Sequence, residues 1–138
     1  ELAGDVRIGE REGDAPDHTR RLAAMVDQCL PYPGLLERDF ILWVELWLRA
    51  SRHPELRPTA SRLYGRIHEW FRAAIVDGVE SGEFRSTDPD RLADRLLALL
   101  DGFGIRVLVG DLPIEGARAE AWAVLAAELE LDPEAPPR

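Results

Sequence analysis

The stretch that decides the fold is residues 88–110, DPDRLADRLLALLDGFGIRVLVG. It begins as a helix should, because Asp88 can accept a hydrogen bond from a free N–H group and Pro89 suits the first helical position. Only Asp101 and Arg106 are charged in the second half of this stretch, so apolar residues surround the helix on every side. We therefore expect a helix that is covered on most of its surface.

This helix is too short to cross a bilayer, which requires about 18 or more apolar residues. One side can pack on the core of its own chain, and a second copy of the chain is the simplest partner for the rest. Gly102 lies on a narrow stripe with Ala98, Arg106 and Val109, where another helix could approach closely. The alternative is a central core helix with no partner chain.

The composition describes one acidic, globular domain. The chain has 138 residues, 46% of them hydrophobic, and a formal net charge of −9. This charge argues against direct binding to a phosphate backbone.

A single cysteine, Cys29, excludes an internal disulfide, and we expect it to be a small core residue. We find no secretion signal or membrane span and expect a cytoplasmic protein. Because the chain begins at Glu1, we expect its N-terminus to be a cut edge.

Four other segments carry the apolar period of an α-helix. They are residues 17–30, 35–53, 58–81 and 114–130. The turns between them are marked by proline and glycine, and no segment alternates as a strand would. The sequence therefore predicts an all-α bundle of about five to six helices. In residues 35–53 apolar residues occur on two sides of Glu45, so we expect its carboxylate to be buried. It would then form a salt bridge with Arg49 or contact a ligand.

No arrangement of residues typical of catalysis or metal binding is present. The three histidines lie far apart, one cysteine cannot form a metal-binding pair, and phosphate-binding glycine motifs are absent. We therefore expect no enzyme activity, no cofactor and no metal.

Three segments, in order, resemble the C-terminal regulatory domain of tetracycline-repressor (TetR) family transcription regulators. They are LWVELWLRASRHPELR at 42–57, IVDGVESGEFRSTDPDRLADRLLALLDGF at 75–103 and LELDPEAP at 129–136. The resemblance covers roughly residues 18–136 and is strongest to the betaine-regulator-like branch.

The resemblance implies a bacterial regulator, usually a repressor, whose all-helical domain binds a small molecule and forms a homodimer through its last two long helices. It places an effector-binding and dimerisation domain at 17–131, the end of a connecting helix or a linker at 1–16, and a polar tail at 132–138. The family's N-terminal helix-turn-helix domain is absent from this sequence, so operator DNA is a partner only through that missing domain.

Aromatic residues on three predicted helices indicate a wall for an apolar ligand, whose charge stays open. The residues predicted to bind it are Trp43, Glu45, Trp47, Tyr64, Ile67, His68, Trp70, Phe71 and Phe103. The residues predicted at the dimer interface are Ala98, Gly102, Val109, Trp122, Leu125 and Leu129. The alternative function is a helical interaction module whose core is filled and binds no ligand.

Overall fold

The computed structural model describes residues 17–133, which form helices and no strand. The helices are α2 (Asp17–Gln28), α3 (Leu35–Arg52), α4 (Arg57–Glu80), α5 (Pro89–Leu108) and α6 (Ile114–Leu129), with a short 3-10 helix, η1 (Pro54–Leu56), between α3 and α4. This architecture confirms the predicted all-α class. The predicted linker at 1–16 and most of the predicted tail lie outside the described residues. No helix in the described part combines the length and apolar character that a membrane crossing requires.

Local signals in the sequence explain where the helices begin and end. The Asp88 side chain accepts a hydrogen bond from the Arg91 amide at 3.2 Å, and Pro89 is the first residue of α5. After α4, Gly82 adopts a left-handed φ of 86° that a residue with a Cβ rarely takes. This turn lets the Phe84 ring fold back onto Gly78 of α4. All three features agree with the helix boundaries predicted from the sequence.

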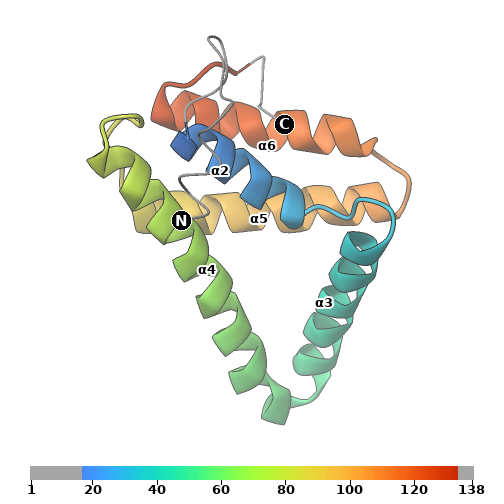
Figure 1. Ribbon diagram of the computed structural model, residues 1–138. Helices are drawn as coiled ribbons and strands as arrows, with labels where there is room; N and C mark the ends of the chain where they lie inside the picture. Colours follow the sequence, from blue (N-terminus) through green and yellow to red (C-terminus); the bar gives the residue numbers. More distant parts are fainter. Residues whose placement is uncertain (1–16, 134–138) are drawn as a thin grey trace.

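The hydrophobic core lies among α2, α4, α5 and α6. In Figure 1, α5 and α6 run side by side and α2 lies across them, while one end of α4 packs against α5. Its largest fully buried side chains are Trp122, Phe71, Leu22, Leu30, Ile75, Leu92, Leu96, Leu100, Leu125, Leu129 and Val26. At roughly 1.5–3 kcal/mol for each buried large apolar side chain, this cluster is the main source of stability.

Polar contacts tie α2 to the rest of this core. At its start, the Glu83 carboxylate accepts hydrogen bonds of 2.6 Å from both the amide and the hydroxyl of Thr19. At its end, Asp27 accepts hydrogen bonds from Arg118 of α6 at 2.6 Å and from the Tyr32 hydroxyl at 3.0 Å. Arg118 is only 3% exposed, so its charge requires this carboxylate. Both ends of α2 are therefore fixed.

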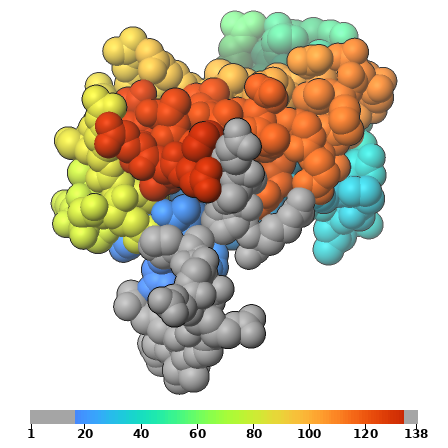
Figure 2. Space-filling model, turned by 90° about the horizontal axis from the view of Figure 1, so that it is seen from above, coloured from blue at the N-terminus to red at the C-terminus, as the bar shows by residue number. Residues whose placement is uncertain are grey.

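Three residues of α6 that were predicted at the dimer interface lie in the core of the single chain instead. Trp122, Leu125 and Leu129 are 1%, 0% and 0% exposed in this single chain, and the Trp122 indole donates to the Asp132 carbonyl at 2.8 Å. These large side chains face their own core because α6 must cover α5 and α2, so they offer no surface to a second chain. The outward face of α6 instead carries mainly small residues, with the exposed Glu120 among them, and Figure 2 shows α6 lying across the surface of the molecule.

Helix α3 stands away from the core. In Figure 1, α3 and α4 meet at η1 and diverge from there, and α5 forms the third side of a triangle. Phe40 and Ala50 are the two buried residues of α3. Near the turn, the Arg57 guanidinium donates hydrogen bonds to the backbone carbonyls of Ala50 at 2.9 Å and Ser51 at 3.1 Å. These contacts fix the angle between α3 and α4.

The prediction of a buried Glu45 is wrong. Glu45 is exposed, and no ion pair joins it to Arg49 among residues 17–133. The apolar residues that suggested burial on two sides include Ile41 and Leu48, which are 42% and 53% exposed. The cause is that α3 contacts the bundle along one edge, so a carboxylate on its other side remains in water.

Substitution of two glycines of α4 tests how tightly the turn after this helix packs. A Cβ at Gly78 would overlap the Phe84 ring, whereas a Cβ at Gly65 would meet nothing within 4 Å. We expect Gly78→Ala to lower the free energy of unfolding by about 1–3 kcal/mol through overpacking. We expect Gly65→Ala to raise it by up to about 1 kcal/mol through helix propensity. Urea denaturation followed by circular dichroism measures both, and equal effects would contradict this packing.

Candidate functional site

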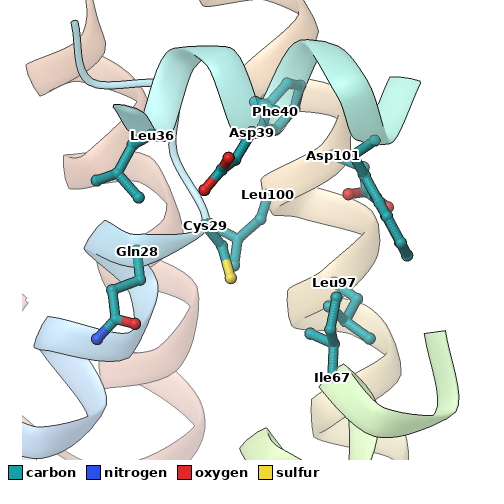
Figure 3. A pocket seen from close by; sticks show the side chains of 10 residues that line it. Gln28, Cys29, Leu36, Asp39, Phe40, Ile67, Leu97, Leu100 and Asp101 are labelled. Carbon is teal, nitrogen blue, oxygen red and sulfur yellow. The ribbon is translucent and has the colours of Figure 1, made fainter. Parts of the chain in front are cut away.

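A cavity of about 210 Å³ lies where α2, α3, α4 and α5 approach one another (Figure 3). Its lining residues are Gln28, Cys29, Leu36, Asp39, Phe40, Trp43, Ile67, Leu97, Leu100 and Asp101. Six of these ten are aliphatic or aromatic, so most of the wall is apolar. The polar groups are few, as in most small-molecule sites.

Phe40 and Gly104 set the position of the cavity. A Cβ at Gly104 would overlap the Phe40 ring, so this ring lies directly against the backbone of α5. Phe40 is 7% exposed and lines the cavity from the α3 side. Within this chain, a helix is approached closely at Gly104 and not at Gly102, where a Cβ would meet nothing within 4 Å, so the predicted approach of a second chain at Gly102 stays a prediction.

Three aromatic rings extend the wall of the cavity away from the core. Trp43 lines the cavity, and its ring centroid lies 4.9 Å from that of Tyr64 and 5.7 Å from that of Trp47. Trp47 and Tyr64 are stacked, with centroids 5.5 Å apart and planes 14° apart. The Trp47 indole N–H is buried and makes no hydrogen bond within the described residues. The aromatic cluster Trp43–Trp47–Tyr64 therefore joins α3 to α4.

Asp101 connects this aromatic cluster to α5. The Tyr64 hydroxyl donates a hydrogen bond of 2.7 Å to the Asp101 carboxylate. Burial raises the pKa of Asp101, and hydrogen bonds from Tyr64 and Trp43 oppose that rise. Burial also raises the pKa of Tyr64, with a further contribution from its hydrogen bond to Asp101. Tyr64 therefore stays a neutral donor at pH 7, and Asp101 has no cationic partner in the wall.

The charges around the cavity all have one sign. The ten lining residues include two carboxylates, Asp39 and Asp101, and no arginine or histidine. In Figure 3 the Asp39 and Asp101 carboxylates lie on opposite sides of the view, with Leu100 between them. Nowhere in residues 17–133 do three or more His, Cys, Asp or Glu side chains gather as metal ligands. Aromatic faces beside an unpaired carboxylate suit an organic cation.

Comparison with known sequences decides the family. A family model described as "BetI-type transcriptional repressor, C-terminal" matches residues 18–131. The chain belongs to the TetR family of transcriptional regulators. This result confirms the resemblance drawn from the three segments, and the domain is the BetI-type C-terminal domain of that family. No curated protein sequence matches the chain.

Two solved structures agree with this assignment. One is a protein described as a transcriptional regulator from Saccharomonospora viridis, in complex with choline. It is 32% identical, its TM-score is 0.76, and the match covers 93% of this chain and 67% of that one. The other, described as a TetR-family transcriptional regulator from Rhodococcus sp., has a TM-score of 0.74 and 24% identity. It shows the fold, over 82% of this chain and 61% of its own. The family and these relatives are regulators of transcription, not enzymes.

The structure brings together four of the nine residues predicted to bind a ligand. Trp43 and Ile67 line the cavity of this BetI-type domain, and Trp47 and Tyr64 belong to the aromatic cluster beside it.

The other five predicted residues do not line this cavity, which corrects their placement. Phe71 is fully buried in the core, Trp70 is 37% exposed and packs on Phe71, and Phe103 packs against the core. His68 lies near the Asp90 carbonyl and the Asp94 carboxylate, at 3.2 and 3.3 Å. Glu45 is exposed on α3. The helical period placed these residues on the correct helices but did not distinguish the pocket side from the core side.

Sequence reasoning missed several residues of the wall. Asp39 lies one helical turn before Trp43, and this spacing of four places both side chains on one face of α3. That spacing is the signal that could have identified Asp39. Gln28 is the last residue of α2 and Cys29 follows it, and only knowledge that α2 stops beside α3 assigns them to the cavity.

The surroundings of Cys29, a half-buried residue, disfavour its thiolate form. Burial, with a smaller contribution from the nearby Asp101 charge, raises the pKa of Cys29 from 9.0 to about 12. Because only the thiolate reacts, we expect Cys29 to react with a disulfide reagent at pH 8 at least about 100-fold more slowly in the folded chain than in guanidinium-unfolded chain. Absorbance of the released thiolate measures both rates. Equal rates would contradict a raised pKa of the Cys29 thiol.

Proposed function

We propose that this chain is the effector-binding and dimerisation domain of a TetR-family regulator and that its cavity binds a small organic cation of the choline type. The observation that carries the proposal is the Asp101 carboxylate, which lies beside the aromatic cluster Trp43–Trp47–Tyr64 in a wall without basic side chains. The choline complex of the regulator that is 32% identical supports it.

The chemistry of a quaternary ammonium group fits these surroundings. Such a group carries a charge but has no N–H to donate, so hydrogen-bond acceptors alone do not hold it. Aromatic faces attract it through their quadrupole, by about 2 kcal/mol or more where water is excluded. Trp43 supplies a ring at the cavity, and Asp101 supplies the opposite charge. The proposal thereby assigns a positive charge to a ligand whose charge the sequence analysis left open.

The surroundings of the Asp101 carboxylate favour the binding of a cation. The elevated pKa of Asp101 reflects burial that disfavours its negative charge. A cation that enters the cavity stabilises this charge, so part of the unfavourable electrostatic free energy of the empty site is relieved on binding. The hydrogen bond from Tyr64 holds the carboxylate in place for that contact.

We propose that the domain forms a homodimer through the outward faces of α5 and α6. On α5, Ala98 and Gly102 are exposed, and Val109, directly after this helix, is 72% exposed. On α6, the outward face carries Ala119, Ala123, Val124 and Ala127, with the exposed Glu120 among them, so small apolar side chains make up most of this face. Small side chains allow helices of two chains to approach closely. The proposed interface therefore consists of these outward-facing residues of α5 and α6, and not of the large buried residues of α6.

In the whole protein, we propose, ligand binding controls an N-terminal DNA-binding domain. The match covers 67% of the Saccharomonospora viridis chain, which leaves room for such a domain in a protein of that length. A ligand that prefers one arrangement of α3, α4 and α5 shifts the population towards it, by no more than its difference in affinity for the two arrangements. The two DNA-binding domains of a cytoplasmic repressor dimer would then change their spacing.

Choline binding tests the proposed function. We expect choline to bind the chain in isothermal titration calorimetry, to change tryptophan fluorescence and to raise the melting temperature. We expect Asp101→Asn to weaken binding at least tenfold, which is about 1.4 kcal/mol or more, because the nearest opposite charge is lost.

Glu45→Gln is the matched control for this variant. It removes one carboxylate from α3 at an exposed position that does not line the cavity. We expect less than a twofold change in choline affinity. Absence of choline binding by the wild-type chain at millimolar concentration would contradict the proposed function.

The oligomeric state tests the proposed dimer. We expect a dimer at micromolar concentration in sedimentation velocity, with an interface on the order of 1,600 Å² or more. Gly102→Arg, which adds bulk and charge to the outward face of α5, should give monomer or aggregate. Gly65→Arg is its control, because Gly65 is exposed on α4 with nothing near its side-chain position. A wild-type monomer, or equal disruption by both variants, would count against this interface.

A further inference from the structure

We infer that Asp39 is a specificity-determining residue of the cavity, which selects cations that end in a neutral or positive group and excludes those that end in a carboxylate. This inference rests on the proposed function, since it concerns the second end of the proposed cationic ligand. The observation behind it is that the cavity has two carboxylates, one from α3 and one from α5, and no basic side chain in its wall.

The two carboxylates have different surroundings. Asp101 is half-buried and accepts a hydrogen bond from the Tyr64 hydroxyl beside the aromatic rings. Asp39 is exposed, and within residues 17–133 it forms no hydrogen bond or ion pair. In Figure 3, Asp39 points from α3 towards the side of the cavity where Gln28 and Cys29 lie, away from Asp101. The part of the cavity beside Asp101 and the aromatic rings therefore suits the ammonium group. The part beside Asp39, here called the Asp39 end, would contact the group at the opposite end of the ligand.

The polar groups at the Asp39 end decide what that other group can be. A hydroxyl can donate a hydrogen bond to the Asp39 carboxylate, and the Gln28 side chain, which also lines the cavity, offers both a donor and an acceptor. A carboxylate on the ligand would instead face the like charge of Asp39, and no arginine or histidine in the wall can compensate for it. Like charges that face each other repel, and at an exposed residue such as Asp39 this repulsion is strongest at low ionic strength. The wall therefore admits an ammonium alcohol and rejects the corresponding ammonium acid.

Two probes separate these alternatives. Choline carries a trimethylammonium group and a hydroxyl, and glycine betaine carries the same cationic group with a carboxylate in place of the alcohol carbon. Because the ammonium ends are identical, the ratio of the two affinities reports on the far end of the ligand. We expect the wild-type chain to bind choline at least tenfold more tightly than glycine betaine at low ionic strength, in calorimetric titrations.

The variant Asp39→Asn keeps the size of the side chain and replaces its charge with an amide that can donate to a carboxylate. We expect glycine betaine to gain affinity and choline to lose some, so that the ratio of affinities falls at least fivefold. Asp39 is exposed, so the variant should keep the melting temperature of the unliganded chain, which serves as the check on folding. Glu45→Gln, the same loss of one charge on the same helix outside the cavity, should leave the ratio unchanged within twofold.

The outcomes distinguish this inference from the proposed function. If the wild-type chain binds choline and glycine betaine equally, or if Asp39→Asn leaves the ratio unchanged, the role of Asp39 is overturned while the proposed cation site stands. If Glu45→Gln lowers the ratio as much as Asp39→Asn, selectivity comes from the overall charge of the chain, and Asp39 has no special role. If the wild-type chain binds neither probe at millimolar concentration, the proposed function fails, and the inference fails with it.

Discussion

The contact between the Phe40 ring and the backbone of Gly104 is the constraint on which the site depends. Glycine is required there because a Cβ on α5 would occupy the position of the ring. This contact holds one end of α3 against α5, while the hydrogen bonds of Arg57 hold the other end at the turn into α4. Away from these contacts α3 stands off the core, and the cavity lies beside the Phe40 end of α3, where Leu36, Asp39 and Trp43 also line it. The cavity is thus a consequence of helix geometry rather than of a missing core residue.

Much of the fold could be predicted because its signals are local. Asp88 and Pro89 begin α5, Gly82 ends the α4 segment, and the 3.6-residue period marks each helix, so the predicted segments lie close to the observed ones. Side-chain burial could be predicted less well, because it depends on which neighbour covers each face. Apolar residues on two sides of α3 looked buried, yet Leu48 is 53% exposed, because α3 packs on the bundle along one edge.

The candidate site was predicted in part for the same reason. Trp43, Tyr64 and Ile67 were expected near a ligand, and they lie at the cavity or beside it. Phe71 has the same aromatic character but faces the core, and the sequence alone gives no rule that separates the two sides of α4. Asp39 was missed because an exposed acidic residue looks like ordinary helix surface until α2 and α5 are known to face it. Packing between distant segments, not local propensity, decides these assignments.

The central claim is that the space between α3, α4 and α5 is a binding site for a small organic cation, and not an unfilled gap in a helical interaction module. A crystal structure of the chain grown with choline tests this most directly. The account predicts the trimethylammonium group in the cavity, in contact with the Trp43 ring and the Asp101 carboxylate, with the Phe40–Gly104 contact intact. Choline bound elsewhere on the molecule, or a cavity closed by inward movement of α3 with no ligand in it, would contradict the account.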